Sequence, residues 1–261
     1  MRRLALALLA LAAGGAGAQE AAPGPLSARA ELLHRTLRER DETGRRLVTE
    51  EGAMLRLALD ARWPLANGGA LQGSASVAAG RLDYDGQDQS GAPLATRSRE
   101  RELGLSLAWR PLAPAAWGEA WVVLHGLQQT RQIAATATVS GLDESSTLLM
   151  PGVRWTHAFS AAGWQWQPSV ALRASVQHRV HVAFGGLFDD ASFRGGRRWE
   201  SELALEASAP DSPWRWGIAW THARQQASAT STVTRAGNVA GTVRQPRISI
   251  DDLGLRARRA F

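Results

Sequence analysis

The residue types that most often carry enzyme chemistry are sparse and scattered in this chain of 261 residues. It has no cysteine, which excludes thiolate nucleophiles, thiolate metal sites, disulfides and a lipid-bearing N-terminal cysteine. Two of the histidines, His178 and His181, lie three apart, a spacing that points side chains to opposite faces of a strand. The remaining histidines are His34, His125, His157 and His222. We therefore predict no metal site and no cofactor.

Two further patterns could carry chemistry. The segment 83–88 (DYDGQD) offers oxygen ligands for calcium, but it lacks the later glutamate of an EF-hand loop. Because Asp-Gly is a common turn signal, we interpret the segment as a turn. A serine–histidine pair is the other possibility, and His125 is its best candidate. No serine stands out as its partner, so catalytic residues are not predicted.

The charge and the first residues bear on location. All 30 basic residues are arginine, the formal net charge is +6, and there are 11 tryptophans. The chain contains no basic helix or aromatic–basic platform, so we do not expect nucleic-acid binding. Residues 1–18 have a basic start, an apolar stretch and a small-residue end, which is typical of a cleavable export signal. We interpret residues 19–28 as a flexible linker and residues 29–261 as one domain.

That domain repeatedly alternates apolar and polar residues. Between Gly52 and Trp63 the odd positions are apolar, and three of their even neighbours are Arg56, Asp60 and Arg62. Such strands place the two rows on opposite faces. A soluble sandwich would bury the apolar row, whereas a membrane barrel turns it toward lipid. The expected strands reach ten residues or more and the polar rows carry both charge signs, which favours an antiparallel up-and-down transmembrane β-barrel.

The end of the chain resembles a known family. The alternating segment 251–261 ends in Phe261, as does the closing strand of Gram-negative outer-membrane β-barrels, in which this ending is read by the assembly machinery. Arg259 departs from the pattern, because an apolar or aromatic residue is usual there. The resemblance implies an outer-membrane location, membrane lipid and the assembly machinery as partners, and a single-chain barrel that we expect to be monomeric. It identifies no functional subfamily.

Ten strands are expected, with eight or twelve as alternatives. They are placed at 29–40, 47–63, 70–84, 96–110, 117–130, 147–158, 164–182, 196–208, 214–226 and 246–261. The weakest of these strand predictions are the first, whose apolar row is poor, and the fifth, in which two alternating rows compete for the apolar face. Short connections at 64–69, 111–116, 160–163 and 209–213 belong to the periplasmic side, and longer ones outside. Tryptophans crowd the short connections and predict an interfacial aromatic girdle: Trp63, Trp109, Trp117, Trp164, Trp166, Trp214 and Trp216.

The charges fall into two sets. The first set lies in the alternating rows that are expected to face the lumen. It predicts an ion network that plugs a narrow barrel: Arg56, Asp60, Arg62, Glu102, Arg154, Arg173, Glu200, Glu202, Glu206, Asp252, Arg256 and Arg258. The second set lies in the lipid-facing rows, at the outer ends of the strands. It predicts a rim of arginines beside lipopolysaccharide phosphates: Arg45, Arg81, Arg97, Arg99, Arg101 and Arg197. A solvated rim without a specific ligand is an equal alternative.

These patterns favour a non-enzymatic structural or surface-interaction role. A narrow channel for small solutes is the first alternative, and a barrel enzyme acting on protein or lipid is the second. Omptin-type outer-membrane proteases use an acidic pair and an Asp-x-His pair. Asp83 and Asp85 resemble the first element, but Asp-x-His occurs nowhere in the chain.

Overall fold

The computed structural model describes residues 26–87, 91–137 and 139–261. The predicted export signal and residues 19–25 of the predicted linker lie outside this range. Leu26, Ser27 and Ala28, which the linker prediction included, already belong to the first strand. The described residues contain no helix long and apolar enough to cross a membrane.

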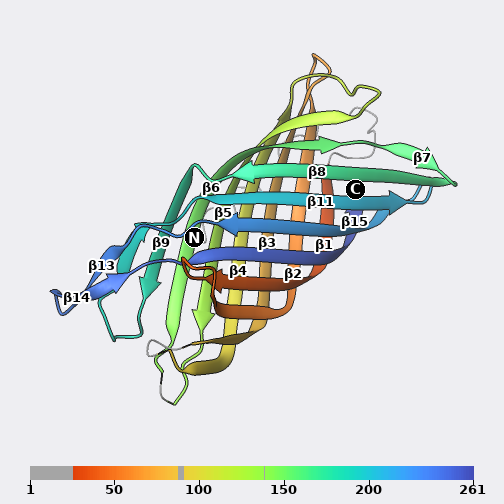
Figure 1. The fold of residues 1–261 in the computed structure, drawn as a ribbon. Helices are drawn as coiled ribbons and strands as arrows, with labels where there is room; N and C mark the ends of the chain where they lie inside the picture. Colours follow the sequence, from red (N-terminus) through yellow and green to blue (C-terminus); the bar gives the residue numbers. More distant parts are fainter. Residues whose placement is uncertain (1–25, 88–90, 138) are drawn as a thin grey trace.

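Ten antiparallel transmembrane strands close into a barrel (Figure 1). We use stave for one complete transmembrane strand of the barrel, which can consist of one element or two. Eight of the ten staves are single elements: β1 (Leu26–Arg40), β2 (Arg46–Pro64), β3 (Ala70–Gln87), β4 (Pro93–Arg110), β5 (Glu119–Ile133), β6 (Leu142–Thr156), β11 (Arg198–Ser208) and β12 (Trp214–Gln225). The ninth consists of β8 (Trp164–Ala174) followed by β9 (Gln177–Ala183), and the tenth is β15 (Arg247–Ala260). Pairing of β1 with β15 closes the ring, and β6 pairs with both β8 and β9. The predicted number of strands and up-and-down order are confirmed.

One predicted strand is wrong in detail. Residues 164–182 do not form an uninterrupted strand, because Ser175 and Val176 separate β8 from β9. At this break the Ser175 amide donates to Arg198 and the Val176 amide donates to Leu149, on opposite neighbours. The irregularity turns His178 inward, where it is buried, whereas β8 places its even-numbered residues outward. Even-numbered side chains therefore face outward in β8 and inward in β9, a reversal that a strict period-two pattern cannot predict.

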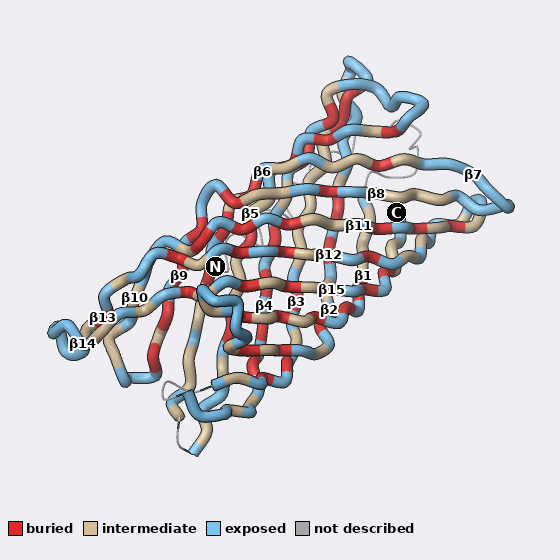
Figure 2. Tube along the Cα trace, in the orientation of Figure 1, coloured by how far each residue is buried: buried red, intermediate tan, exposed pale blue. Residues whose placement is uncertain are grey.

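Burial alternates along the staves, as the sequence pattern requires (Figure 2). On β4 the side chains of Leu103, Leu105 and Leu107 are exposed while Glu100 and Glu102 are buried. Exposed leucines and valines recur at the same level on the neighbouring strands, forming an apolar outer band. The barrel is therefore apolar outside and charged inside, the reverse of a soluble sandwich.

The two weak strands are present. In β5 the ambiguity is resolved by burial: Trp121 and Val123 face the lumen, while Val122 and Leu124 face outward. The first strand has a poor apolar row because His34, Thr36 and Arg38 occupy the outward positions of its outer half. Its regular pairing with β2 and β15 holds it in the sheet regardless of this polarity.

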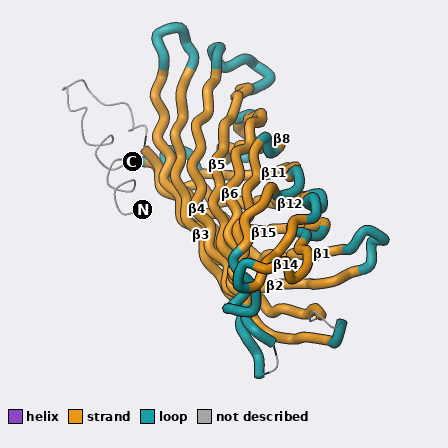
Figure 3. The backbone as a smooth tube through the Cα atoms, turned by 90° about the vertical axis from the view of Figure 1, so that its left-hand side faces the viewer, coloured by secondary structure: helices purple, strands orange, loops and turns teal. Residues whose placement is uncertain are grey.

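Connections differ at the two ends (Figure 3). At one end lie the four short turns, one of which carries the small strand β7 (Phe159–Ala161). At the other end the connections between β9 and β11 and between β12 and β15 are longer and carry strands of their own, whereas a tight turn follows β1. There Asp41 accepts hydrogen bonds from Thr43 Oγ1 at 2.7 Å and from the Arg45 amide at 2.9 Å. By the rule for bacterial barrels we assign the short-turn end to the periplasm. The two ends are named inner and outer below.

The last outer loop carries a protruding hairpin, β13 (Ser231–Arg235) with β14 (Asn238–Val243). Ala236 and Gly237 form its turn with positive φ angles of 50° and 78°. The neighbouring loop, which carries β10 (Ala191–Arg194), holds the tip through Asp189. Its carboxylate accepts from Thr234 Oγ1 at 2.6 Å and from the amides of Ala236 and Gly237 at 3.1 and 3.0 Å.

The hairpin anchor is expected to depend on pH. The Thr234 hydroxyl and the Gly237 amide hold the pKa of Asp189 below its ordinary value, so the contact is present above about pH 4 and is lost as the pH falls through the lowered pKa. Hydrogen-exchange protection of the Ala236 and Gly237 amides should fall in that range, and should be absent at every pH in Asp189→Ala. The Gly68 amide, which donates to the Leu65 carbonyl, is the control. Equal protection in the variant would contradict this anchor.

Candidate functional site in the barrel lumen

The outer half of the lumen is crossed by a buried arginine. Arg35, 1% exposed, extends from β1 and donates to both oxygens of Asp252 on β15, at 2.8 and 2.7 Å. It also contacts Glu100 at 2.5 Å and Glu102 at 2.6 Å, both on β4. Since β4 lies three strands from β1, these bonds span the barrel interior.

A second buried arginine lies closer to the outer end. Arg131 on β5 contacts Glu39 on β1 at 2.6 Å and pairs with Glu50 on β2. Glu144 on β6 lies 3.8 Å from the same guanidinium. Glu50 is fully buried and also accepts from Ser98. This cluster therefore joins four strands above the level of Arg35.

Apolar side chains fill the space around these ion pairs. Leu37, Ala223, Ile248 and Ile250 form one buried cluster, and Leu127, Leu148 and Met150 form another. Removing water from charges is costly unless each charge is paired and hydrogen-bonded, as Arg35 and Arg131 are. The outer half is thus a packed interior and not a water-filled passage.

The inner half is hollow. A cavity of about 470 Å³ runs from below Arg35 to Ser27 and Ala260, at the inner ends of β1 and β15. All twelve residues predicted for the lumen charge network line it. Arg56, Arg173 and Arg256 form a connected series there, since Arg256 contacts Glu31 and Glu202 at 3.0 and 2.8 Å. Arg173 contacts Glu200 and Glu202 at 2.7 and 2.9 Å.

The other predicted lumen residues are less completely paired. Arg258 lies 3.3 Å from Glu206, and Arg62 lies 3.0 Å from Glu119. Arg154 donates to Gln72 at 2.6 Å and contacts no carboxylate within ion-pair distance. Asp60 likewise has no ion-pair partner within the described residues. The expectation that lumen charges are paired is therefore wrong at Arg154 and Asp60.

Sequence reasoning missed the most buried members of the network. Arg35, Glu100, Arg131 and Glu50 were not among the predicted residues, because their neighbours along the chain are themselves polar or charged, as Arg99 and Arg101 are beside Glu100. The available signal was the row Glu31, Arg35, Glu39 in the first strand, which shares one parity. Its outward row is too polar to reveal which face meets the lipid.

The predicted aromatic girdle lies at the inner end. Six of its seven tryptophans are exposed on the outside, and Trp166 is half-buried. Trp214 and Trp216 stack at 5.9 Å, and Arg259 lies over the ring of Trp214 at 5.5 Å. Trp155 also belongs to this end, donating to the Trp117 carbonyl at 3.0 Å.

The predicted rim arginines are all exposed, but they fall into different environments. Arg45 lies in the β1–β2 turn and pairs with Asp41 at 3.1 Å, while Arg197 lies 4.4 Å from the ring of Trp199. Arg97 is 3.6 Å from Asp83. Arg81, Arg99 and Arg101 have no ion-pair partner within the described part of the chain, and Arg81 lies directly opposite Arg99.

The position of Arg81, Arg99 and Arg101 along the membrane normal follows from strand geometry. Along the outer face of β4, Arg101 is eight residues from Trp109. At about 3.3 Å per residue and a tilt of about 40°, the two are separated by about 20 Å along the membrane normal. Trp109 marks the inner interface and the apolar band of such barrels is about 25 Å tall, so Arg99 lies at the outer interface and Arg101 about 5 Å below it.

Two histidine contacts could support chemistry. His125 faces the cavity and its Nδ1 lies 2.6 Å from Ser106 Oγ, but no carboxylate is hydrogen-bonded to the ring among the described residues. On the outer surface Ser201, His222 and Asp251 lie side by side on three adjacent strands. Asp251 lies 2.7 Å from His222 Nδ1, but Nε2 accepts from Arg224, and Ser201 donates to the His222 carbonyl. Neither group joins nucleophile, base and carboxylate in one series of hydrogen bonds.

Other chemistry has little support in the described residues. No group of three or more histidine, aspartate or glutamate side chains there could hold a metal ion. Asp83 and Asp85, considered above as an acidic pair, face the outside of β3 beside Arg97 and Arg46. Residues 88–90 of the possible calcium segment lie outside the described range.

A closed ten-stranded barrel with an apolar outside and a charged lumen is the fold of outer-membrane β-barrel proteins. Among solved structures, the chain is similar to the outer-membrane protease OmpT from Escherichia coli, with a TM-score of 0.56 and 11% identity over 95% of this chain and 100% of that one. The translocator domain of the autotransporter NalP from Neisseria meningitidis gives 0.47 at 11% identity, covering 99% and 96%. No protein-family model and no curated protein sequence matches the chain. The likeness defines the fold alone.

The central role of Arg35 leads to a stability prediction. Arg35→Met would leave Glu100, Glu102 and Asp252 buried without their shared cation, and breaking such a buried cluster costs about 3–5 kcal/mol. Urea unfolding in lipid vesicles should show a loss of this size. Arg38→Met removes a half-exposed arginine of the same strand, β1, which lies 3.6 Å from Asp251 on β15, and it should cost about 0–1 kcal/mol. Equal losses in the two variants would show that the lumen bridges do not stabilise the barrel.

Proposed function

We propose that this chain is a monomeric outer-membrane barrel with a non-conducting lumen and a non-enzymatic structural or surface-interaction role. The observation that carries the proposal is the pair of buried clusters around Arg35 and Arg131, which join strands across the outer half of the lumen. A solute passing through would have to separate ion pairs in a region packed with apolar side chains. The barrel fold, the apolar band and the tryptophan girdle support an outer-membrane location.

Export and assembly are part of this proposal. Residues 1–18 would act as the cleavable signal, and Phe261 as the assembly signal. Phe261 is 52% exposed, and its amide donates to the Leu26 carbonyl at 3.0 Å, next to the seam between β1 and β15. An exposed aromatic side chain at the seam is accessible to the machinery that closes the barrel.

Planar-bilayer recording tests the non-conducting lumen. The purified full-length protein should give no current steps above those of the lipid alone, because the outer half of the lumen is occupied by its own side chains. Heat-dependent gel mobility of the same sample shows that the barrel is folded and inserted. Reproducible steps of uniform size would establish the narrow-channel alternative.

The rim favours lipopolysaccharide as a surface partner. Arg81, Arg99 and Arg101 project from adjacent strands at or just below the outer interface and have no ion-pair partner among the described residues, and guanidinium groups form paired hydrogen bonds to phosphate. A groove at this level is lined by Arg81, Arg97, Arg99 and Gln132, with Asp143 as its one carboxylate among the described residues. We propose that these side chains contact the phosphates of the outer-leaflet lipid.

Vesicle binding tests the rim. Each arginine near an anionic membrane surface contributes about 1 kcal/mol, so Arg99→Gln with Arg101→Gln should weaken binding to lipopolysaccharide by about 2 kcal/mol, or about thirtyfold. The matched control Arg194→Gln with Arg235→Gln removes the same charge from the outer loops and should have little effect. Equal weakening in both double variants, or equal binding to dephosphorylated lipid, would favour the solvated rim.

A further inference from the structure

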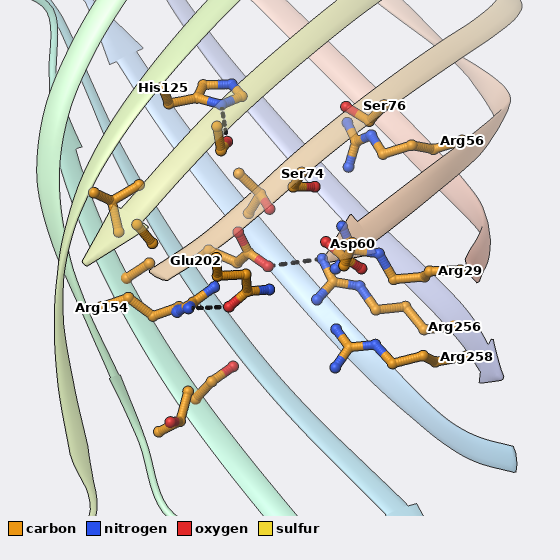
Figure 4. Close-up of a pocket in the computed structure, with 18 of the residues that line it drawn as sticks. Arg29, Arg56, Asp60, Ser74, Ser76, His125, Arg154, Glu202, Arg256 and Arg258 are labelled. Carbon is orange, nitrogen blue, oxygen red and sulfur yellow. Dashed lines mark hydrogen bonds and ion pairs between the residues drawn. The ribbon is translucent and has the colours of Figure 1, made fainter. Parts of the chain in front are cut away.

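The inner mouth of the lumen contains a row of like charges. Arg29 on β1 lies directly opposite Arg258 on β15, which in turn lies directly opposite Arg215 on β12. Side chains in such positions on one face have Cβ atoms about 4.5–5.5 Å apart, and like charges placed there are destabilising. Arg154 projects from β6 toward the same space (Figure 4). Four guanidinium groups from four strands therefore share one end of the cavity.

The protein supplies too few acceptors for these groups. Arg258 has one carboxylate neighbour, Glu206, at 3.3 Å, and the hydrogen bonds of Arg154 and Arg215 go to neutral glutamines. Arg29 makes no hydrogen bond to any described residue, and the Asp60 carboxylate, which lines the same cavity, is the charged group that acts on it most strongly. The Nε atoms of Arg29, Arg154 and Arg258 are buried without a partner. This contrasts with Arg35, whose guanidinium is bound on several sides by carboxylates.

The cavity itself has an excess of positive charge. Its lining includes ten arginines but only seven aspartates and glutamates, and the excess is reduced but not removed by Glu31 and Glu100, which pair with lining arginines from just outside the cavity. The surplus lies at the inner end, since the carboxylates nearer the barrel centre are shared among Arg35, Arg56, Arg173 and Arg256. At about 470 Å³, the space holds a small ion together with water.

We propose that this inner mouth binds a small divalent oxyanion, such as inorganic phosphate or sulfate, through Arg29, Arg154, Arg215 and Arg258. Such an ion carries the missing charge and offers several acceptor oxygens to forked guanidinium donors. The ion enters from the inner end, because the Arg35 and Arg131 clusters close the outer one. The site is separate from the outer rim, and it requires neither lipopolysaccharide binding nor a particular surface role.

Thermal unfolding followed by heat-dependent gel mobility tests the site. In lipopolysaccharide-free detergent, the midpoint for the full-length protein should rise with phosphate or sulfate and saturate, compared with chloride at the same ionic strength, because a ligand that binds only the folded state stabilises it. Arg29→Gln with Arg215→Gln should lower the apparent phosphate affinity at least tenfold. Without phosphate this variant should unfold at a higher temperature than the wild type, since it relieves the repulsion along the row.

Matched controls separate this site from other arginines. Arg194→Gln with Arg235→Gln removes two charges from the outer loops, and Arg99→Gln with Arg101→Gln removes two from the rim; both should keep the wild-type phosphate response. Arg154→Gln provides a second lumen variant if the first does not fold, and it should also weaken the response. The proposal is overturned if phosphate and chloride act alike at equal ionic strength, or if the lumen variants keep wild-type affinity.

Discussion

The structure depends on how charges are accommodated inside a narrow closed barrel. Every strand of the barrel contributes an inward row of side chains, and these rows fill the outer half of the lumen and leave a cavity in the inner half. Arg35 meets this constraint by bonding Asp252, Glu100 and Glu102 simultaneously. Because Arg35 is on β1 and its partners are on β4 and β15, the bonds also fix the relative positions of strands far apart in the sheet. The closed shape and the sealed outer half follow from the same interactions.

The two halves of the lumen satisfy this constraint differently. In the outer half, carboxylates surround each buried arginine and apolar side chains fill the gaps. In the inner half, Arg29, Arg154 and Arg215 have neutral partners or none within the described residues, and a cavity separates them. The proposed roles follow this division. A sealed outer half suits a surface-facing barrel, and an open, positively charged inner half suits a small anion from the periplasmic side.

Much of the architecture was predictable because period-two alternation is a local property. Ten strands, the outward band, the inner tryptophans and the twelve charged cavity residues all follow from parity within single strands. The failures are equally physical. The break at Ser175 and Val176 reverses parity within one stave, and the polar outward row of β1 conceals its inward row. Arg35 and Glu39 were missed for that reason, although they are central to the two outer clusters.

The sequence alone determined which side chains face inward in the strands with a clear apolar row, since neighbouring residues on a strand must point to opposite faces. It also determined the excess of arginine over carboxylate. Only the tertiary structure decided which charges meet. Arg35 and Asp252 are 217 residues apart, and their contact exists because closure of the ring places β1 beside β15. The same closure sets Arg29, Arg258 and Arg215 in one row, since register between strands, unlike parity within a strand, is a property of the assembled sheet.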